Sequence, residues 1–313
     1  MSLNSTNLEE LWQKYKERHT KNYQQHIEER RKATWLKNCE KIKMHNEKAM
    51  KGILSFTLAS NPLADMTLKH YHSSMVKLLR SKGRDVADPE IVGNMHIDYE
   101  NVPKELDWRA KGFETPPNNQ KDCGSCYAFS IAHSIQAQIF KQTNVLEPLS
   151  EQQIVDCSLK SGNHGCAGGS LRNTLKYLEH SGGLMGAKDY PYSAKQTTCR
   201  FRKNKVLVNL TSWAILPARD ERAMEAIVAN VGPVAASINA SPHTFQLYKT
   251  GVYDDTACSQ NVVNHAMLIV GYTKDAWILK NWWGKRWGED GYMRLKKNQN
   301  QCGIANYVAY VIV

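Results

Sequence analysis

A short stretch of the sequence places a cysteine where it could act as a nucleophile. The run Cys123-Gly124-Ser125-Cys126 leads into residues 126–140, in which apolar side chains recur at helical spacing. A helix N-terminus carries about half a positive charge, which stabilises a thiolate, and the thiolate is the nucleophilic form of cysteine. Cys126 is therefore expected to be reactive, although both cysteines of this stretch could instead be disulfide partners.

The chain contains eight cysteines. An even number suggests disulfides, and disulfides suggest an oxidising compartment. Cys123 and Cys126 form one C-x-x-C pair, but no second such pair and no paired histidines follow at the spacing of a zinc finger. We therefore expect no metal site and no cofactor.

Length and composition exclude several classes of protein. The 313 residues allow one large or two smaller domains, and a content of 42% hydrophobic and 23% charged residues argues against a disordered or collagen-like chain. No run approaches about 18 uninterrupted apolar residues and the start lacks an apolar segment, so neither a transmembrane helix nor a signal peptide is expected. The net charge of +11 is spread along the chain, which predicts a basic surface rather than a nucleic-acid site.

Local patterns predict the elements that must position the reactive cysteine. Residues 1–50 contain no Pro or Gly and are typical of charged amphipathic helices. Residues 81–104 are typical of an extended connector, and residues 162–169 are typical of a glycine-rich loop. Ser150 and Gln153 predict a helix start with a capping box. After about residue 205 the helical half gives way to a strand-rich half. The predicted strands are 206–210, 234–238, 266–272, 276–280 and 292–295.

Two residues far downstream stand at informative distances from Cys126. His265 follows it by 139 residues, and Asn281 follows it by 155 residues within a Lys-Asn-Trp-Trp-Gly segment. Together with Cys-Gly-Ser-Cys-Tyr at 123–127, this order of motifs resembles the papain-like cysteine proteases, and in particular the cathepsin L-like subfamily, over nearly the whole chain. The resemblance implies an α+β, papain-like two-lobed fold. One lobe would be helical and the other similar to a β-barrel, with the cleft between them and a mainly helical propeptide in front.

The resemblance also implies a role for each polar residue of this set. Cys126 and His265 would form a thiolate–imidazolium pair that attacks a peptide carbonyl, after which His265 protonates the leaving amine. Asn281 would hydrogen-bond the other imidazole nitrogen, and Trp283 would shield that bond from water. Gln120, with the backbone N–H of Cys126, would form the oxyanion hole. A cysteine endopeptidase is therefore expected.

Three positions depart from the family pattern. Tyr127 stands for the usual Trp, Trp282 for the Ser that usually follows the catalytic Asn, and Lys121 for a Gly. None of these changes removes a catalytic group, so we expect an active enzyme with altered edges of the cleft.

The cysteines are paired by the same resemblance. It leaves Cys126 as the odd thiol of the enzyme and Cys39 as a free thiol of the N-terminal part. The implied disulfides are Cys123 with Cys166, Cys157 with Cys199, and Cys258 with Cys302.

The first hundred residues resemble the propeptide of cathepsin L-like enzymes. One helix motif and one loop motif carry the resemblance, with departures at Ile27, Trp35, Ala59 and Leu63. Glu28 lies one place from the position of the expected Glu, which puts one salt bridge of the helix motif in question. The residues that fit the motifs are Arg31, Trp35, Asn38, Ile42, Asn46, Asn61 and Asp65.

A zymogen of two parts follows from this resemblance, with an inhibitory propeptide at 1–101, its extended connector at 81–101 included, and a papain-like protease domain at 102–313. The segment around 75–79 would cross the cleft in the reverse of the substrate direction and block it without being cut. Acidification would protonate carboxylates and weaken salt bridges between the two parts, which predicts slow self-activation at about pH 4–5. Cleavage is expected near Asn101-Val102.

The alignment also names the substrate-binding residues. Gly168 and Gly169 would pair with the extended substrate backbone, because glycine allows close approach. The S2 pocket would be apolar, which predicts a hydrophobic P2 residue, and Tyr307 at its base would favour Leu or Val over Phe or Trp. The full expected set is Gly168, Gly169, Leu171, Ser237, Val263, Asn264, Trp283 and Tyr307.

Three other classes of protein compete with an endopeptidase precursor. They are a catalytically dead binding protein on the same scaffold, an inhibitor built on the propeptide, and another Cys-His acyl transferase such as a transglutaminase or glutaminase. The retained Cys126 disfavours the first, and the motif contexts disfavour the last. The expected partners are polypeptide substrates, the chain's own propeptide and cystatin-type inhibitors. The expected state is a lysosomal or secreted monomer that binds neither nucleic acid nor membrane.

Overall fold

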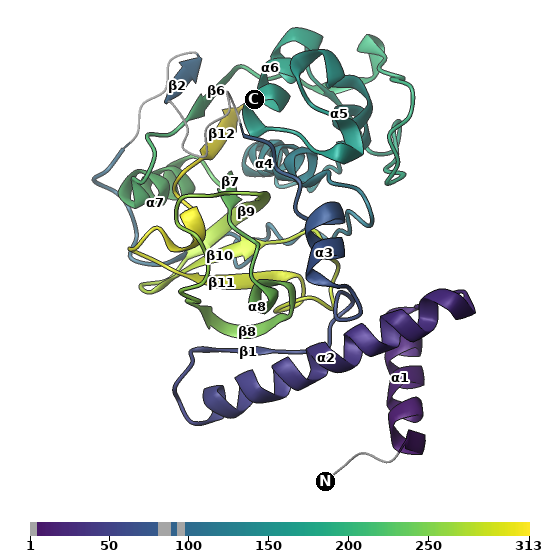
Figure 1. The fold of residues 1–313 in the computed structure, drawn as a ribbon. Coiled ribbons are helices and arrows are strands. Elements are labelled where there is room, and N and C mark those ends of the chain that lie inside the picture. Colours follow the sequence, from purple (N-terminus) through teal and green to yellow (C-terminus); the bar gives the residue numbers. More distant parts are fainter. Residues whose placement is uncertain (1–4, 81–88, 93–97) are drawn as a thin grey trace.

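The computed structural model describes residues 5–80, 89–92 and 98–313. Figure 1 shows two long N-terminal helices beside a strand-rich lobe, with a helical lobe on the opposite side of the strands. The N-terminal region contains α1 (Ser5–His19), α2 (Gln25–Met50), β1 (Phe56–Leu58), α3 (Leu68–Ser74) and β2 (Glu90–Val92).

The chain turns between α1 and α2 without the Gly or Pro that would mark a turn in the sequence. Thr20 takes a positive φ of 54° at this point. The turn lets aromatic side chains of the two helices meet, because the rings of Trp12 and Tyr15 each lie 5.5 Å from the ring of Trp35. This aromatic cluster fixes α1 across α2, and Figure 1 shows the two helices crossing.

The helical lobe is built around one buried helix. Its helices are α4 (Cys126–Thr143), α5 (Glu151–Cys157) and α6 (Leu171–Ser181). The Ser150 hydroxyl caps α5 by accepting from the Gln153 backbone N–H. The predicted capping box is wrong, because the Gln153 side chain donates to Tyr177 Oη and Gly183 O, while the Ser150 N–H donates to Met185 O.

The strand-rich lobe contains a ten-stranded sheet. The strands beyond the N-terminal region are β3 (Leu106–Asp107), β4 (Leu184–Met185), β5 (Val206–Val208), β6 (Ser212–Ile215), β7 (Val234–Ile238), β8 (Tyr248–Tyr253), β9 (His265–Tyr272), β10 (Ala276–Lys280), β11 (Tyr292–Lys296) and β12 (Val308–Ile312). The remaining helices are α7 (Glu221–Asn230) and α8 (His243–Gln246), and single 3-10 turns cover Leu159–Ser161, Gly165–Ala167, Lys203–Lys205 and Gln301–Gly303.

The N-terminal region supplies both outer strands of this sheet. The strand order is β1-β8-β11-β10-β9-β7-β12-β6-β2, with β3 paired to β9 outside this path and β4 paired to β5 in a separate two-stranded sheet. All neighbours are antiparallel except β8 and β11. The connector predicted at 81–104 therefore contains a strand, while its residues 81–88 and 93–97 lie outside the described part of the chain.

Three disulfides cross-link the lobes' loops. The S–S distances are 2.04 Å for Cys123–Cys166, 2.07 Å for Cys157–Cys199 and 2.11 Å for Cys258–Cys302. These are the pairs that the family resemblance implies, and Cys39 and Cys126 are free thiols. In the described ranges, no helix has both the length and the apolar character to cross a membrane.

Candidate active site

The candidate nucleophile and base begin two elements that meet at the junction of the lobes. Cys126 is the first residue of α4 and His265 is the first residue of β9, and both are fully buried. Burial raises the pKa of the Cys126 thiol to about 12, although backbone hydrogen bonds at Ala266 and Lys77 act in the opposite direction. Burial also lowers the pKa of His265 to about 4. Both groups are therefore neutral in this form of the protein.

The imidazole of His265 is held by two residues that follow β10. Its Nε2 lies 2.8 Å from Asn281 Oδ1. The Trp283 ring stacks on the imidazole with the ring centroids 4.8 Å apart, and it is itself buried. Within the described part of the chain His265 Nδ1 has no hydrogen-bond partner, so a thiolate–imidazolium pair is not formed here.

The candidate oxyanion-hole residue already binds carbonyl oxygens. Gln120 Nε2 donates to Met75 O at 3.1 Å and to Cys123 O at 2.9 Å. The Gln120 backbone N–H donates to Trp282 O at 2.8 Å, which fixes the loop before α4 to the Asn281 segment. A carbonyl of the N-terminal region therefore occupies the donor expected to stabilise a reaction intermediate.

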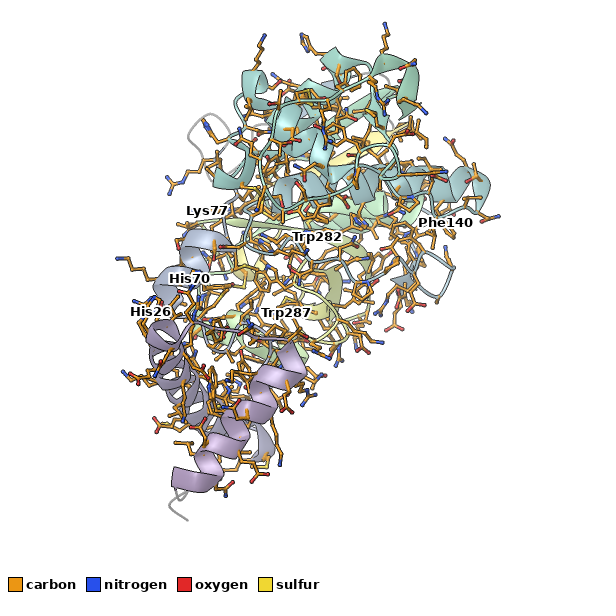
Figure 2. All side chains as sticks on the ribbon, turned by 90° about the vertical axis from the view of Figure 1, so that its right-hand side faces the viewer. His26, His70, Lys77, Phe140, Trp282 and Trp287 are labelled. Atoms are coloured by element: carbon orange, nitrogen blue, oxygen red, sulfur yellow. A yellow bond between two sulfur atoms is a disulfide. The ribbon has the colours of Figure 1, made fainter. Side chains whose placement is uncertain are left out.

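The segment after α3 lies across the same site. The Leu78 N–H donates to Asn264 O at 2.9 Å, and the Leu79 N–H donates to Gly169 O at 2.8 Å. Leu78 and Gly169 form a parallel bridge. A Cβ on Gly168 would lie 2.2 Å from Lys77 O, so this glycine allows the two backbones to approach. Figure 2 shows Lys77 directly above His70 of α3, at about the height of Trp282.

The expected S2 residues surround a leucine of this segment. Leu171, Val263 and Tyr307 line a residual cavity of about 10 Å³ together with Leu78 and Leu79, of which Leu78 packs against the hydrophobic core. Ser237 does not line that cavity; it is fully buried in β7, and its N–H donates to Tyr307 O at 2.8 Å. The pocket is thus nearly filled by an aliphatic side chain of the N-terminal region.

Sequence reasoning missed a buried arginine that supports the pocket. Arg172 Nε donates to Tyr307 Oη at 3.2 Å, and the Arg172 guanidinium pairs with Glu90 of β2. Lys176 lies 3.5 Å from the same carboxylate. No sequence signal connects positions 90 and 172, because only the fold brings β2 next to α6.

The residues of the helix motif tie α2 to the chain that follows it. Asn38 Nδ2 donates to Ala64 O at 2.8 Å, and Trp35 Nε1 donates to Ser60 Oγ at 2.7 Å. Asn46 exchanges two 2.9 Å hydrogen bonds with the backbone of Leu58. Ile42 packs against the hydrophobic core. These contacts hold the following loop and β1 against α2.

The loop motif continues these contacts into the enzyme. Asn61 Nδ2 donates to Gln246 O at 2.8 Å. Asp65 is buried, accepts from the Tyr23 hydroxyl and lies 3.5 Å from Lys21, while Arg31 donates to the Asp65 carbonyl at 3.3 Å.

Glu28 makes an ion pair within the N-terminal region. Its carboxylate pairs with Lys16 and accepts from Trp12 Nε1 at 2.9 Å. The carboxylate of Glu28, which lies one place from the position that the motif expects, therefore binds to α1.

The described residues contain no group of three or more His, Cys, Asp or Glu side chains that could hold a metal ion. The polar atoms gathered at Cys126 are instead those of an imidazole and two carboxamides, from His265, Asn281 and Gln120. This donor set is suited to acyl transfer through a thiol.

Comparison with known proteins places these features in a family. Residues 102–312 match the papain family cysteine proteases, and residues 12–71 match the cathepsin propeptide inhibitor domain. The chain is 38% identical to cathepsin L of Sarcophaga peregrina, covering 98% of this chain and 93% of that protein. It is 36% identical to human cathepsin L2, covering 97% and 92%.

Solved proforms share the whole fold. The structure of a digestive procathepsin L 3 from the larval midgut of Tenebrio molitor superposes with a TM-score of 0.86 at 32% identity, covering 98% of this chain and 99% of that chain. A recombinant stem bromelain precursor superposes with the same TM-score at 28% identity, covering 98% and 99%. The predicted α+β, papain-like architecture with a helical propeptide is thereby confirmed. The chain belongs to the papain family of cysteine proteases and is a cathepsin L-like zymogen with an inhibitory propeptide.

Proposed function

We propose that Cys126 is the nucleophile of an endopeptidase whose cleft residues 1–101 block until they are removed. The observation that carries this proposal is the path of residues 75–79. Their backbone binds Gln120, Asn264 and Gly169, and their side chains fill the S2 pocket. Matches to the inhibitor domain at 12–71 and the protease at 102–312 support a boundary near Asn101-Val102.

The reaction begins when loss of the propeptide returns water to the buried pair. The Cys126 proton then moves to His265 Nδ1, and the thiolate attacks the substrate carbonyl carbon. The resulting oxyanion accepts hydrogen bonds from Gln120 Nε2 and the Cys126 N–H. His265 protonates the departing amine, which leaves a thioester that water hydrolyses with His265 as base. Asn281 holds the ring through Nε2 during both steps.

The order of contacts along residues 75–79 supports a reversed path. Met75 lies at Gln120, and Leu78 and Leu79 lie at the pocket of Leu171 and Tyr307. A substrate must place its P2 side chain in that pocket and its later residues beyond the oxyanion hole, so it runs in the opposite direction. The carbonyl that Gln120 binds here, Met75 O, therefore belongs to a chain that runs against the direction of a substrate.

The S2 pocket supports a preference for aliphatic P2 residues. Leu78 and Leu79 line the small space that remains in it, and Tyr307, held by Arg172, closes its base. We therefore expect Leu or Val at P2 to be hydrolysed faster than Phe or Trp, because a larger ring would have to displace the tyrosine.

Acid activation is supported by histidines between the propeptide and the enzyme. Burial lowers the pKa of His45 and of His243, which line one groove between α2 and residues 254–257, and lowers that of His19 to about 4. Each of these groups is ordinarily half protonated at pH 6.5. The detached propeptide and enzyme therefore bind protons more readily than the complex. The propeptide therefore binds the enzyme more weakly as the pH falls from 6.5 toward the lowered pKa values that these histidines have in the complex. Lys41, Lys48, Asp254 and Asp255 face the same groove.

The proposed compartment is supported by the covalent chemistry. Three disulfides and an acid-sensitive complex suit a lysosome or a secreted digestive fluid. The proposed partners are polypeptide substrates, the propeptide itself and cystatin-type inhibitors that enter the same cleft. The proposed state is a monomer.

The decisive experiment compares the wild-type chain with Cys126→Ser during incubation at pH 4.5. Wild type should lose its propeptide, bind one equivalent of an epoxysuccinyl affinity label at Cys126 and hydrolyse peptides with Leu at P2. The Cys126→Ser protein should remain intact. Equally fast self-cleavage by Cys126→Ser would contradict the assignment of the nucleophile. A peptide panel with a preference for Arg or Phe at P2 would contradict the pocket assignment.

A further inference from the structure

Trp282 stands where related enzymes usually have a serine, directly after the catalytic asparagine. We infer that its indole is a positioning residue that sets the helix of the nucleophile against the strand of the base. The inference rests on the proposed roles of Cys126 and His265. It goes beyond them because Trp282 itself does not take part in the reaction.

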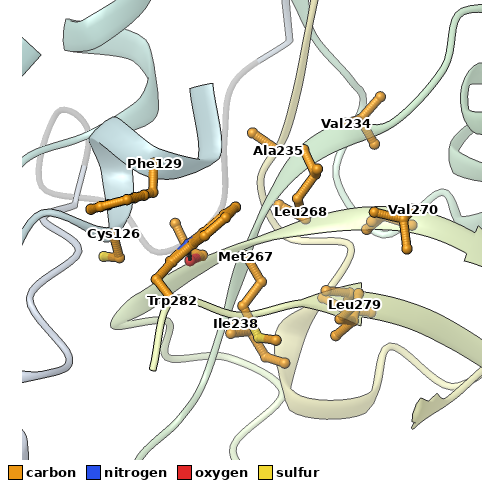
Figure 3. Packing of buried hydrophobic residues seen from close by; sticks show 14 of the residues in the cluster. Cys126, Phe129, Val234, Ala235, Ile238, Met267, Leu268, Val270, Leu279 and Trp282 are labelled. Atoms are coloured by element: carbon orange, nitrogen blue, oxygen red, sulfur yellow. Dashed lines mark hydrogen bonds between the residues drawn. The ribbon is translucent and has the colours of Figure 1, made fainter. Parts of the chain in front are cut away.

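The indole joins the two elements that carry the reacting groups. Its ring stacks on Phe129, one turn after Cys126 on α4, with centroids 5.4 Å apart and planes inclined by 26°. Its Nε1–H donates to Ala266 O at 2.9 Å, directly after His265 on β9. Figure 3 shows the Phe129 and Trp282 rings close to one another, with Cys126 just below Phe129 on the same helix.

The backbone of Trp282 binds the other two catalytic groups. Its N–H donates to Asn281 Oδ1 at 2.9 Å, the same oxygen that accepts from His265. Its carbonyl accepts from the Gln120 N–H at 2.8 Å. A serine could keep both backbone bonds. The link between α4 and β9, in contrast, needs the ring and its N–H.

Buried titratable groups beside the indole make its packing more consequential. The His133 ring lies 4.8 Å from the Trp282 ring, and His133 Nε2 lies 3.3 Å from Glu151 Oε1. Lys280 Nζ lies 6.0 Å from the same ring and donates to Pro116 O at 2.8 Å. Removing the indole would open a void beside this buried His–Glu pair and this buried lysine, and α4 could shift toward it.

Misplacing the two reacting groups should reduce turnover rather than substrate binding. A displacement of about 1 Å costs on the order of 100-fold in rate when it disturbs an attack geometry. The expected subsite residue Tyr307 is held by Arg172 Nε, which donates to its hydroxyl, and by the Ser237 N–H, which donates to its carbonyl, so KM should change little. The geometry therefore predicts a kcat effect together with a shift in the pH profile, because ion-pair formation depends on the Cys126–His265 distance.

The test uses the full-length chain activated at acid pH, with Trp282→Ser and Trp282→Phe. We expect kcat to fall about 10- to 100-fold for Trp282→Ser, with KM within twofold and the acid limb of kcat/KM displaced. Trp282→Phe keeps the stacking but loses the bond to Ala266 O, so its kcat should lie between those of wild type and Trp282→Ser. Trp282→Phe also tests the inference if Trp282→Ser does not fold.

Trp277→Phe is the matched control. Trp277 is equally buried in the same lobe, and its Nε1–H donates to Glu221 Oε2 at 2.8 Å, far along the sheet from the catalytic groups. It should lower Tm as Trp282→Phe does while leaving kcat and the pH profile unchanged. Wild-type kcat in both Trp282 variants, or equal kcat losses in Trp282→Phe and Trp277→Phe, would overturn the inference alone. A wild-type chain without peptidase activity would overturn the proposed function as well.

Discussion

The burial of Cys126 predicts that its thiol is chemically silent in the zymogen. At pH 7 a thiol with a pKa of about 12 is ionised in about one molecule in 10⁵, whereas an ordinary thiol with a pKa of 9.0 is ionised in about one in 10². Because alkylating reagents attack the thiolate, Cys126 should react about 1,000-fold more slowly than an ordinary cysteine. Coverage by Lys77 and Leu78 should slow it further.

The measurement is alkylation by iodoacetamide at pH 7, before any acid treatment. A Cys39→Ser background removes the second free thiol, so that uptake of label reports Cys126 alone. The same protein in denaturant gives the rate of an ordinary cysteine. Mass spectrometry of the peptide that contains Cys126 then gives both rates.

The pH dependence supplies an internal check on the cause. Since burial raises this pKa, the zymogen rate should rise about tenfold per pH unit across the neutral range without reaching a plateau. Acid removal of the propeptide should abolish the slow alkylation of Cys126. In the activated protein, His265→Ala should restore much of that slow alkylation. Labelling of the intact zymogen within tenfold of the denatured reference would refute the reasoning.

Other perturbations test the cleft, the trigger and the propeptide. Leu78→Asp should speed self-activation at pH 5.5 by about tenfold or more, measured by gel densitometry, because it places a carboxylate against the apolar core; an unchanged rate would remove Leu78 from the inhibitory contact. Tyr307→Ala should raise kcat/KM for Phe at P2 relative to Leu by about tenfold, since it deepens the pocket, and an unchanged ratio in a peptide panel would mean that Tyr307 does not set its depth. His243→Gln should slow activation severalfold at pH 4.5 and little at pH 6.5, because a proton-binding group that favours release is lost and its contribution is largest below its lowered pKa; equal slowing at both values would point to a structural effect. Asn38→Ala should lower the Tm of the zymogen by a few degrees, as expected when two buried carbonyl groups lose a donor, and an unchanged Tm in calorimetry would contradict that contact.

The sequence predicts best the elements whose burial is visible in a local run of apolar residues. The strands expected at 234–238 and 276–280 coincide with β7 and β10, because continuous apolar runs mark strands covered on both faces. The order of Cys126, His265 and Asn281 likewise predicts the site. Their contacts follow from the fold of the family.

The elements that the sequence does not predict depend on distant partners. β8 contains exposed polar residues, and its pairing with β1 joins positions almost 200 residues apart. Gln153 has the sequence of a capping box but binds Gly183 and Tyr177, which lie closer to its amide once α6 is in place. The groove shared by His45 and His243 has the same origin, because neither position carries a local signal for the other.

The position of β1 and β2 at the two ends of the sheet has a consequence for the life of the enzyme after activation. In the zymogen both outer edges of the sheet are covered by strands that the maturing chain discards. Their departure leaves the backbone N–H and C=O groups of β8 and β6 without these partners, and bare strand edges are the usual points at which proteins join edge to edge. We therefore expect the propeptide also to limit self-association of the enzyme. The mature protein should aggregate at a lower concentration and after a shorter time than its precursor, independently of any proteolysis.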